Sequence, residues 1–221
     1  MDRICQVTDD ELKELVAMAE RAGTDEEVCP VETAYLIAER TLARTCGKGV
    51  MCRDGMRQVY LILKDFVDGR GKGEDDIEML KEILGVIEEV ADCDLSYTAV
   101  TTILSLMNNY SDEFDAHVKR KSCKKLICPG CHTVHIDAAK CQGSGACVKV
   151  CQFNAIKSKE GCFSVIDQSK CTSCNACISV CPNGAIKGAG AVKPQGPTEP
   201  APVGSFGAGG GEGGGRRRRR G

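Results

Sequence analysis

Residues 136–157 read IDAAKCQGSGACVKVCQFNAIK, and residues 166–187 read IDQSKCTSCNACISVCPNGAIK. The two stretches repeat each other at a spacing of 30 residues, and the second holds the complete C-x2-C-x2-C-x3-C-P run that binds an iron–sulfur cluster. The first stretch has Ser144 where the second has Cys174, and Gln152 where the second has Pro182. The repeat therefore predicts two cluster sites suited to electron transfer, one of them altered.

The spacing also predicts which cysteines share a cluster. Three cysteines two residues apart wrap one face of a cluster, whereas the fourth lies on the short helix that follows and points towards the other cluster. This crossed pattern predicts a complete [4Fe–4S] site with the ligands Cys171, Cys174, Cys177 and Cys151. It predicts an altered site made of Cys141, Cys147, Cys181 and, in place of the fourth thiolate, Ser144.

The bland alternatives for these cysteines are a zinc knuckle and a disulfide scaffold, but zinc sites usually have looser spacing. Ser144 leaves three outcomes open: a [3Fe–4S] cluster on three cysteines, a [4Fe–4S] cluster with an oxygen or exogenous ligand, or an empty site. We expect a three-cysteine cluster, because the other ligands keep the motif spacing. The missing thiolate should change the reduction potential, which depends on cluster type and net charge.

Composition agrees with metal binding in a reducing compartment. The chain has 16 Cys and no Trp in 221 residues, and residues 1–20 are charged and lack the apolar core of a signal peptide. No run of 18 apolar residues exists, so we expect no membrane span. Clustered cysteines in the cytoplasm, the expected location, are typical of metal sites. Three further cysteines are expected to be unligated: Cys5, Cys29 and Cys162.

The first 120 residues show helical periodicity and few strand signals. Thr8 followed by Glu11 is typical of a helix N-cap. The apolar spacing predicts helices over about residues 8–22, 31–43, 55–67, 75–90 and 96–108, and a short one from about residue 111 to residue 120. Their short connections favour a small bundle of helices.

The expected fold is therefore α+β: a helical bundle, a two-cluster ferredoxin-like domain of βαβ repeats, and a disordered tail. The predicted parts are an N-terminal helix (1–28), an iron–sulfur-binding helical bundle (29–120), a Cys/His linker (121–134), the ferredoxin-like domain (135–187) and a tail rich in Gly, Pro and Arg (188–221). The tail ends in five arginines at positions 216–220, within a chain of formal net charge −2. Without interleaved aromatic residues, these arginines are weak evidence for nucleic-acid binding, and an acidic partner or the protein's own acidic surface are alternatives.

Residues 45–55 read TCGKGVMCRDG, and a lone cysteine, Cys93, follows the fourth predicted helix. These features resemble the C-terminal iron–sulfur region of the flavin-bearing, NADH-oxidising subunit of respiratory complex I and of NAD-linked and bifurcating hydrogenases and formate dehydrogenases. That family carries SCGKCxPCRxG and then a lone cysteine. The resemblance covers about residues 29–187, with SDEFDAHVKRKSC resembling the link into an appended two-cluster ferredoxin domain.

The resemblance implies that Cys46, Cys52 and Cys93 are three of the four ligands of a further [4Fe–4S] cluster, with Gly49 where the family has its second cysteine. Glycine offers no ligand. One interpretation is a three-cysteine cluster with [3Fe–4S] or labile-iron character. The other is a paralogue that kept the bundle and lost the cluster, although packing alone does not require cysteine at these positions.

A third group of candidate ligands follows the bundle. It contains His117, Cys123, Cys128 and Cys131, with His132 and His135 further on. These residue types and spacings suit a tetrahedral zinc, and the resembled family carries His and Cys residues at this link. An extra iron–sulfur cluster and free thiols remain alternatives.

The sequence lacks a G-x-G-x-x-G on a strand–helix turn and a Ser/His/Asp or Cys/His arrangement, and only about 30 residues precede the region of resemblance. We therefore expect a non-catalytic electron-transfer subunit that relays electrons between a flavoprotein or NADH-linked partner and another redox protein or catalytic subunit, of the hydrogenase or formate dehydrogenase type. Alternatives are a free-standing ferredoxin-like carrier and a non-redox, metal-stabilised assembly or regulatory protein.

Overall fold

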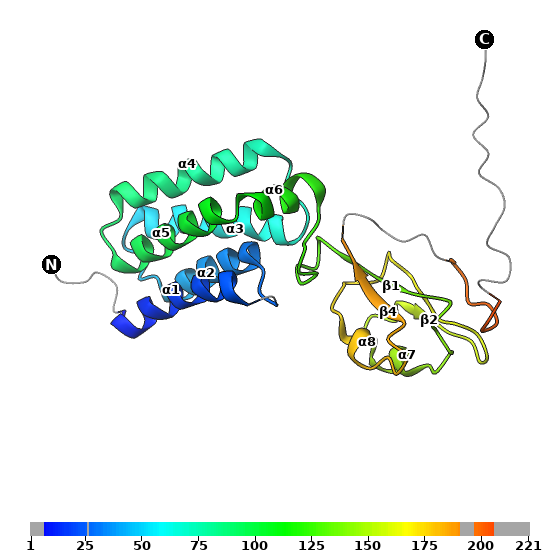
Figure 1. The fold of residues 1–221 in the computed structure, drawn as a ribbon. Helices are drawn as coiled ribbons and strands as arrows, with labels where there is room; N and C mark the ends of the chain where they lie inside the picture. Colours follow the sequence, from blue (N-terminus) through cyan, green and yellow to red (C-terminus); the bar gives the residue numbers. More distant parts are fainter. Residues whose placement is uncertain (1–6, 26, 191–196, 206–221) are drawn as a thin grey trace, which may run out of the picture. The chain divides into compact units, whose positions relative to one another are not determined.

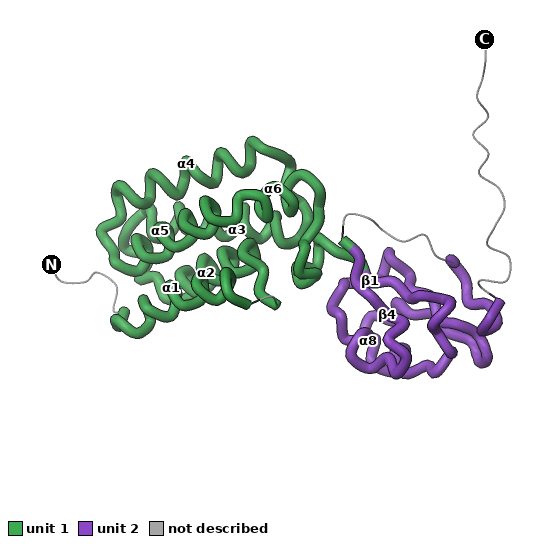
Figure 2. The backbone as a smooth tube through the Cα atoms, viewed as in Figure 1, with its two compact units in different colours: residues 1–133, 190–193 green, residues 134–189, 194–221 purple. Residues whose placement is uncertain are grey.

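The chain folds into two parts of different character (Figure 1). The computed structural model describes residues 7–25, 27–190 and 197–205. The first compact unit is formed by residues 1–133 and 190–193, and the second by residues 134–189 and 194–221 (Figure 2). The arginines at positions 216–220, and the rest of the expected tail beyond residue 205, lie outside the described residues.

Six α-helices and one short π-helix make up the described part of the first unit. They are α1 (Asp9–Thr24), α2 (Pro30–Arg44), η1 (Met51–Gly55), α3 (Met56–Val67), α4 (Glu74–Val90), α5 (Asp94–Asn109) and α6 (Ser111–Arg120). Each α-helix lies where the apolar periodicity predicts one, and the bounds agree to within two residues. None of the helices in the described residues combines the length and the apolar character that a membrane span needs.

The apolar stripes of these helices face one another and form a single core. Leu63 and Phe66 of α3 are fully buried, as are Leu80 and Leu84 of α4 and Ile103 of α5. Burying one such side chain contributes about 1.5–3 kcal/mol. Several cysteines belong to the same core: Cys29, Cys52, Cys93, Cys123, Cys128 and Cys131. These thiols are therefore placed by the packing of the bundle.

The second unit contains two copies of a strand, a cysteine loop, a short helix and a strand. Its elements are β1 (Thr133–Ile136), α7 (Ala146–Val150), β2 (Ile156–Lys157), β3 (Val165–Ile166), α8 (Ala176–Ser179) and β4 (Ile186–Ala189). Strand β1 pairs with β4, and β2 runs antiparallel to β3 with Ile156 opposite Ile166. The predicted α+β class is thus confirmed.

The core of the second unit is small. Its main cluster of buried side chains contains Val134, Cys147, Ile156, Ile166 and Ile186. Half-buried cysteines pack against it: Cys151, Cys171, Cys177 and Cys181. A unit of this size buries little apolar surface, and such units usually need metals or disulfides to be stable.

Part of the expected disordered tail is ordered against the second unit. The amide of Phe163 donates to the carbonyl of Ala201 at 2.9 Å, and the amide of Val203 donates to the carbonyl of Gly161 at 3.0 Å. Cys162 and Pro202 form an isolated antiparallel bridge between these segments. Residues 197–205 therefore extend the ferredoxin-like unit, because their backbone finds hydrogen-bond partners there despite a composition typical of disorder.

Candidate metal centres

The four cysteines of the predicted complete site line one cavity in the second unit. Cys171 and Cys174 come from the loop that leads into α8, Cys177 lies in the first turn of α8, and Cys151 follows the end of α7. The space among these side chains, counted out to open solvent, is about 350 Å³. The amide of Ala155 lies 3.4 Å from Sγ of Cys151, so it can donate a hydrogen bond to a thiolate there. The set fits a four-cysteine cluster, with the ligands crossed between the two repeats.

The altered set also converges on one cavity, of about 300 Å³. Cys141 and Ser144 come from the first loop, Cys147 lies in the first turn of α7, and Cys181 follows α8. The amide of Ala185 lies 3.3 Å from Sγ of Cys181, which matches the amide–thiol contact of the complete site. Three thiols and one exposed hydroxyl therefore face the space that four thiols face in the other repeat.

The altered loop keeps the backbone of a cluster-binding loop. Gly143 and Gly145 both have φ of +68°, and their equivalents Ser173 and Asn175 have φ of +54° and +61°. Residues other than glycine rarely adopt this left-handed conformation, so the second loop maintains it at a conformational cost. The turn hydrogen bonds recur as well: the amide of Cys141 donates to a carbonyl at 3.0 Å, and that of Cys171 does so at 3.1 Å. Ser144 therefore occupies the position of a ligand in an intact loop.

Burial makes one thiol in each cavity less acidic. Burial raises the pKa of Cys177 to about 11 and raises that of Cys147, where a hydrogen bond with Ser164 acts in the opposite direction. Charged thiolates placed together in such a setting repel one another and lose solvation. A bound metal cluster removes this penalty, because thiolates are its natural ligands.

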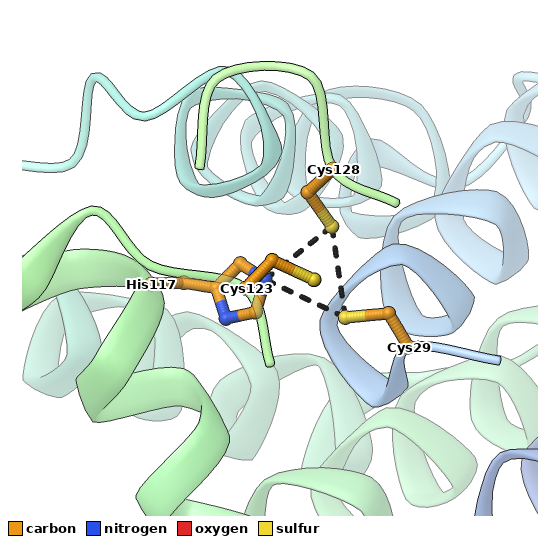
Figure 3. A group of neighbouring side chains, drawn as sticks. All are labelled: Cys29, His117, Cys123 and Cys128. Carbon is orange, nitrogen blue, oxygen red and sulfur yellow. Dashed lines mark hydrogen bonds between the residues drawn. The ribbon is translucent and has the colours of Figure 1, made fainter. Parts of the chain in front are cut away.

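Three buried thiols and an imidazole meet in the first unit (Figure 3). They belong to Cys29, His117, Cys123 and Cys128, and their ligand atoms all lie within 4.8 Å of one another. Nε2 of His117 lies 3.4 Å from Sγ of Cys29 and 3.3 Å from Sγ of Cys128. A tetrahedral zinc with Zn–S bonds of about 2.3 Å places its ligand atoms roughly 3.5–3.8 Å apart. The geometry therefore fits a Cys3His zinc site.

The surroundings of His117 support metal binding through Nε2. Its Nδ1 lies 2.7 Å from the carbonyl oxygen of Glu113. A metal-bound histidine usually donates its other N–H to such an acceptor, which fixes the tautomer and the ring orientation. Hydrogen bonds with Cys128 and Cys29 lower the pKa of Cys123, so the thiolate form that a metal requires is favoured.

The sequence pattern predicts Cys131 as the fourth member of this group, but the structure places Cys29 there. Cys29 is the N-cap residue of α2 and contacts His117, which lies 88 positions later in the chain. Sγ of Cys131 instead donates to the carbonyl of Phe66 at 3.2 Å. The carbonyl of Cys131 accepts a hydrogen bond from the amide of Cys123 at 2.8 Å, so Cys131 shapes the loop that carries two of the thiols.

His132 lies outside the group of four, as does Cys162. Nδ1 of His132 lies 2.8 Å from the carbonyl oxygen of Cys128. Cys162 is buried in the second unit and lines neither of the two cysteine cavities. Cys5 lies outside the described residues.

Cys46, Cys52 and Cys93 gather around the π-helix η1. Cys52 lies within η1, Cys93 is the N-cap of α5, and Cys46 follows α2. Sγ of Cys52 lies 2.7 Å from the hydroxyl of Ser96, which brings η1 against the start of α5, where Cys93 lies. Arg53 of η1 donates to the carbonyl of Gly47, next to Cys46, at 3.3 Å. Burial raises the pKa of Cys52, and charge interactions with Cys93 and Cys46 add to the increase. π-Helical turns occur often at functional sites.

Two neighbours of Cys52 distinguish this site: Gly49, which supplies no ligand atom, and Ser96, which supplies a buried hydroxyl. A Cβ atom placed on Gly49 would lie 3.7 Å from Sγ of Cys52, an ordinary van der Waals distance, so a side chain fits there. On the other side, the fully buried hydroxyl of Ser96 lies 2.7 Å from the same sulfur. Sequence reasoning missed Ser96. The available signal is that it lies three residues after Cys93 on α5 and so shares a helix face with it.

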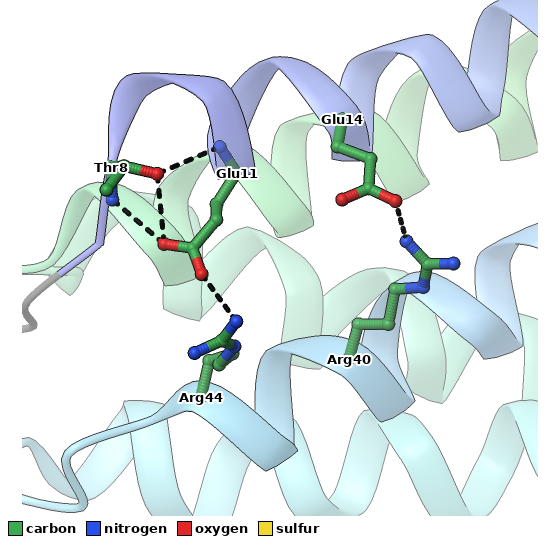
Figure 4. A network of polar contacts seen from close by, with 5 residues as sticks. All are labelled: Thr8, Glu11, Glu14, Arg40 and Arg44. Carbon is green, nitrogen blue, oxygen red and sulfur yellow. Dashed lines mark hydrogen bonds and ion pairs between the residues drawn. The ribbon is translucent and has the colours of Figure 1, made fainter.

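Helix α2 connects the group around His117, which includes Cys29 before the helix's first residue, to Cys46 beyond its end. Its position is set partly by α1, which begins with a capping box between Thr8 and Glu11 (Figure 4). Glu11 also forms an ion pair with Arg44 at 2.7 Å, and Glu14 forms one with Arg40. Exposed ion pairs of this kind contribute little energy each. Both pairs join α1 to α2, so they add to the contact between these two helices.

Comparison with protein families assigns both halves of the chain. Residues 32–117 match the iron–sulfur binding region of NADH-ubiquinone oxidoreductase-F, and residues 134–157 and 164–187 each match the 4Fe-4S binding domain. The resemblance predicted from the cysteine motifs is therefore confirmed. The ranges contain all three cysteines around η1 and both ferredoxin-like loops.

Curated relatives agree. The chain is 37% identical over 132 residues to the HndC subunit of the NADP-reducing hydrogenase of Solidesulfovibrio fructosivorans, which covers 60% of this chain and 27% of that protein. It is 31% identical over 99 residues to the F subunit of the NADH-quinone oxidoreductase of Mycobacterium tuberculosis, and 27% identical to its counterpart in Streptomyces coelicolor, each covering 45% of this chain and 22% of the relative. The chain thus spans about a quarter of the length of these relatives.

We predict that Gly49→Cys restores a fourth thiolate to the three-cysteine site, because the space beside Cys52 accommodates a side chain. The variant should bind about one more iron per chain than the unmodified protein and should lose any oxidised [3Fe–4S] signal that arises from this site. Iron analysis and EPR spectroscopy of anaerobically reconstituted protein measure both quantities. Lys48→Cys adds a thiol at the adjacent exposed position and should change neither, and an equal effect of both variants would contradict the prediction.

We predict that Cys29→Ala removes zinc from the chain, whereas Cys131→Ala, at an equally buried cysteine, does not. Loss of a ligand should weaken zinc binding by more than the roughly 10–100-fold that loss of an outer partner costs. Zinc per chain and the thermal unfolding midpoint, measured with and without a chelator, test this expectation. Equal zinc retention in the two variants would show that Cys29 is not a ligand.

Proposed function

We propose that this chain is an iron–sulfur electron-transfer subunit that relays electrons between a flavoprotein or NADH-linked partner and another redox protein or catalytic subunit of the hydrogenase or formate dehydrogenase type. One observation carries the proposal: each of two crossed sets of cysteines converges on its own cavity within one small unit. The homology of both halves of the chain to iron–sulfur regions of oxidoreductase subunits supports it.

In this proposal the chain's residues hold and tune one-electron centres. Cys171, Cys174, Cys177 and Cys151 hold a [4Fe–4S] cluster, which when bound supplies one-electron transfer. The apolar side chains of Val134, Ile156 and Ile166 line the same cavity and exclude water from it. Cys174 is exposed, so this site has an edge that a redox partner can approach.

Two further sites extend the relay. Cys141, Cys147, Cys181 and Ser144 hold a second cluster of altered type, and Cys46, Cys52 and Cys93 hold a third without a ligand at Gly49. The intact backbone of the first loop supports the second cluster. The contact between Cys52 and Ser96 at the start of α5, together with the family match over residues 32–117, supports the third.

The fourth centre is structural. A zinc ion held by Cys29, His117, Cys123 and Cys128 would join the start of α2, the end of α6 and the loop that follows α6. Cys29 lies 88 positions before His117, so the metal would fasten the start of α2 to the segment in which the chain leaves the bundle for the second unit. Structural zinc contributes directly to folding energy.

The relatives' names indicate the kind of assembly. They are subunits of an NADP-reducing hydrogenase and of NADH-quinone oxidoreductase, which supports partners of the NADH-binding and hydrogenase kinds. The resemblance of the cysteine motifs adds flavin-binding and formate dehydrogenase subunits to the proposed partners. The density of unpaired cysteines suits a reducing cytoplasm. Co-purification with such a partner supports the subunit, whereas isolation as a monomer that shuttles electrons favours a free-standing ferredoxin-like carrier.

We predict that Cys174→Ala disables the complete site. The reduced [4Fe–4S] EPR signal of that site should disappear, iron per chain should fall, and electron transfer to an acceptor protein should slow, because one iron loses its thiolate. Cys162→Ala is the matched control, since Cys162 is a buried cysteine of the same unit that lines neither cavity. Unchanged cluster content and transfer rate in Cys174→Ala would refute the assignment.

A further inference from the structure

The two cysteine cavities of the second unit can be compared residue by residue. Every residue that lines the altered cavity has its equivalent, 30 positions away, in the lining of the complete one. Isoleucines occupy the same two places in both. The informative differences are Ser144 for Cys174, Ser164 for Val134 and Asn183 for Phe153. All three add polarity to the altered cavity. Of the other two differences, Gly145 for Asn175 acts in the opposite direction. Gln142 for Thr172 exchanges one polar side chain for another.

Of the three polar residues that distinguish the altered cavity, only Ser164 is buried. It is 2% exposed, whereas Ser144 and Asn183 are exposed to solvent. Its amide lies 3.5 Å from Sγ of Cys141, and its hydroxyl lies 3.0 Å from Oγ of Ser158.

The Ser164 hydroxyl also hydrogen-bonds with Cys147 and, against the larger effect of burial, lowers the pKa of that thiol. A hydroxyl has one proton and two acceptor sites, so Ser164 can accept from Ser158 while it donates to a sulfur of the altered cavity. The amide is a backbone donor that any residue at this position supplies, so the hydroxyl is the difference that matters.

Val134 marks the contrast in the complete cavity. It is fully buried, and its side chain carries no hydrogen-bond donor. Donors near cluster sulfurs stabilise the more negative, reduced state, and the reduction potential depends on such hydrogen bonds. A buried donor has a larger effect than an exposed one, because little solvent screens it.

We infer that Ser164 raises the reduction potential of the altered site above that of the complete site, so that the altered site is reduced first. The inference rests on the proposed function, since both sites must hold clusters. With both clusters bound, a single electron that reaches the complete site would pass on to the altered site. The first site is oxidised by one electron and the second is reduced by one, and no bond or proton changes place.

Ser164 is a positioning residue in this inference and not a ligand. The test exchanges the two equivalent residues in the full chain, reconstituted without oxygen. Ser164→Val should lower the midpoint potential of the altered site and leave that of the complete site unchanged. Val134→Ser should raise the midpoint potential of the complete site. Potentials are measured by EPR-monitored titration with dithionite as the reductant, and the altered site's signal is identified as the one that Cys147→Ala removes.

Two further variants separate the hydroxyl from packing. Ser164→Ala removes the hydroxyl without adding bulk, and should lower the potential in the same direction as Ser164→Val. Ser164→Thr keeps the hydroxyl and should retain the original potential. These two variants decide the question if a valine at position 164 or a serine at position 134 prevents folding.

Several outcomes would overturn the inference. One is an altered site whose potential lies below that of the complete site in the unmodified chain, and another is an unchanged potential in Ser164→Ala. Loss of the cluster from Ser164→Ala would assign the hydroxyl to assembly instead. If the second unit binds only the complete cluster, this inference is wrong but the proposed function is not contradicted. If the chain assembles no cluster, both are wrong.

Discussion

The structure depends on placing cysteine thiols close together at buried and half-buried positions. In the second unit, half-buried cysteines pack against a core of only a few apolar side chains, and in the first unit, buried thiols lie within the main core. Thiolates in such places are costly unless a cation binds them. Metal binding therefore supplies cohesion that the small apolar core of the second unit does not, and the same contacts create the proposed redox sites.

The two units use cysteine in different ways. In the second, every proposed ligand lies in or beside a short loop whose backbone is held by turn hydrogen bonds, so the geometry is local. In the first, the groups around His117 and around Cys52 are assembled from segments that only the packing of helices brings together. Helix α2 contributes to both groups, through Cys29 before its first residue and Cys46 after its last.

Loss of a thiolate has not removed the surrounding architecture. Gly49 lies beside Cys52 with space for a side chain, and Ser144 occupies a loop whose backbone matches that of the intact repeat. Both sites also have a buried serine near a cysteine, Ser96 in the first unit and Ser164 in the second. A site with fewer thiolates and more hydroxyls has a different charge and hydrogen-bonding environment, which are the properties that set a reduction potential.

The sequence by itself determined what depends on local spacing. The 30-residue repeat and its C-x2-C-x2-C-x3-C-P run predicted the ferredoxin-like region, and apolar periodicity predicted each helix of the bundle, because turns and helix faces follow from neighbouring residues. Only the tertiary structure decided that Cys29 lies beside the imidazole of His117, whereas Cys131 contacts the backbone carbonyl of that residue. It also decided that Ser96 and Ser164 lie beside cysteine sulfurs. Those contacts join segments far apart in the chain, and the packing of a whole core, which spacing does not encode, sets their distances.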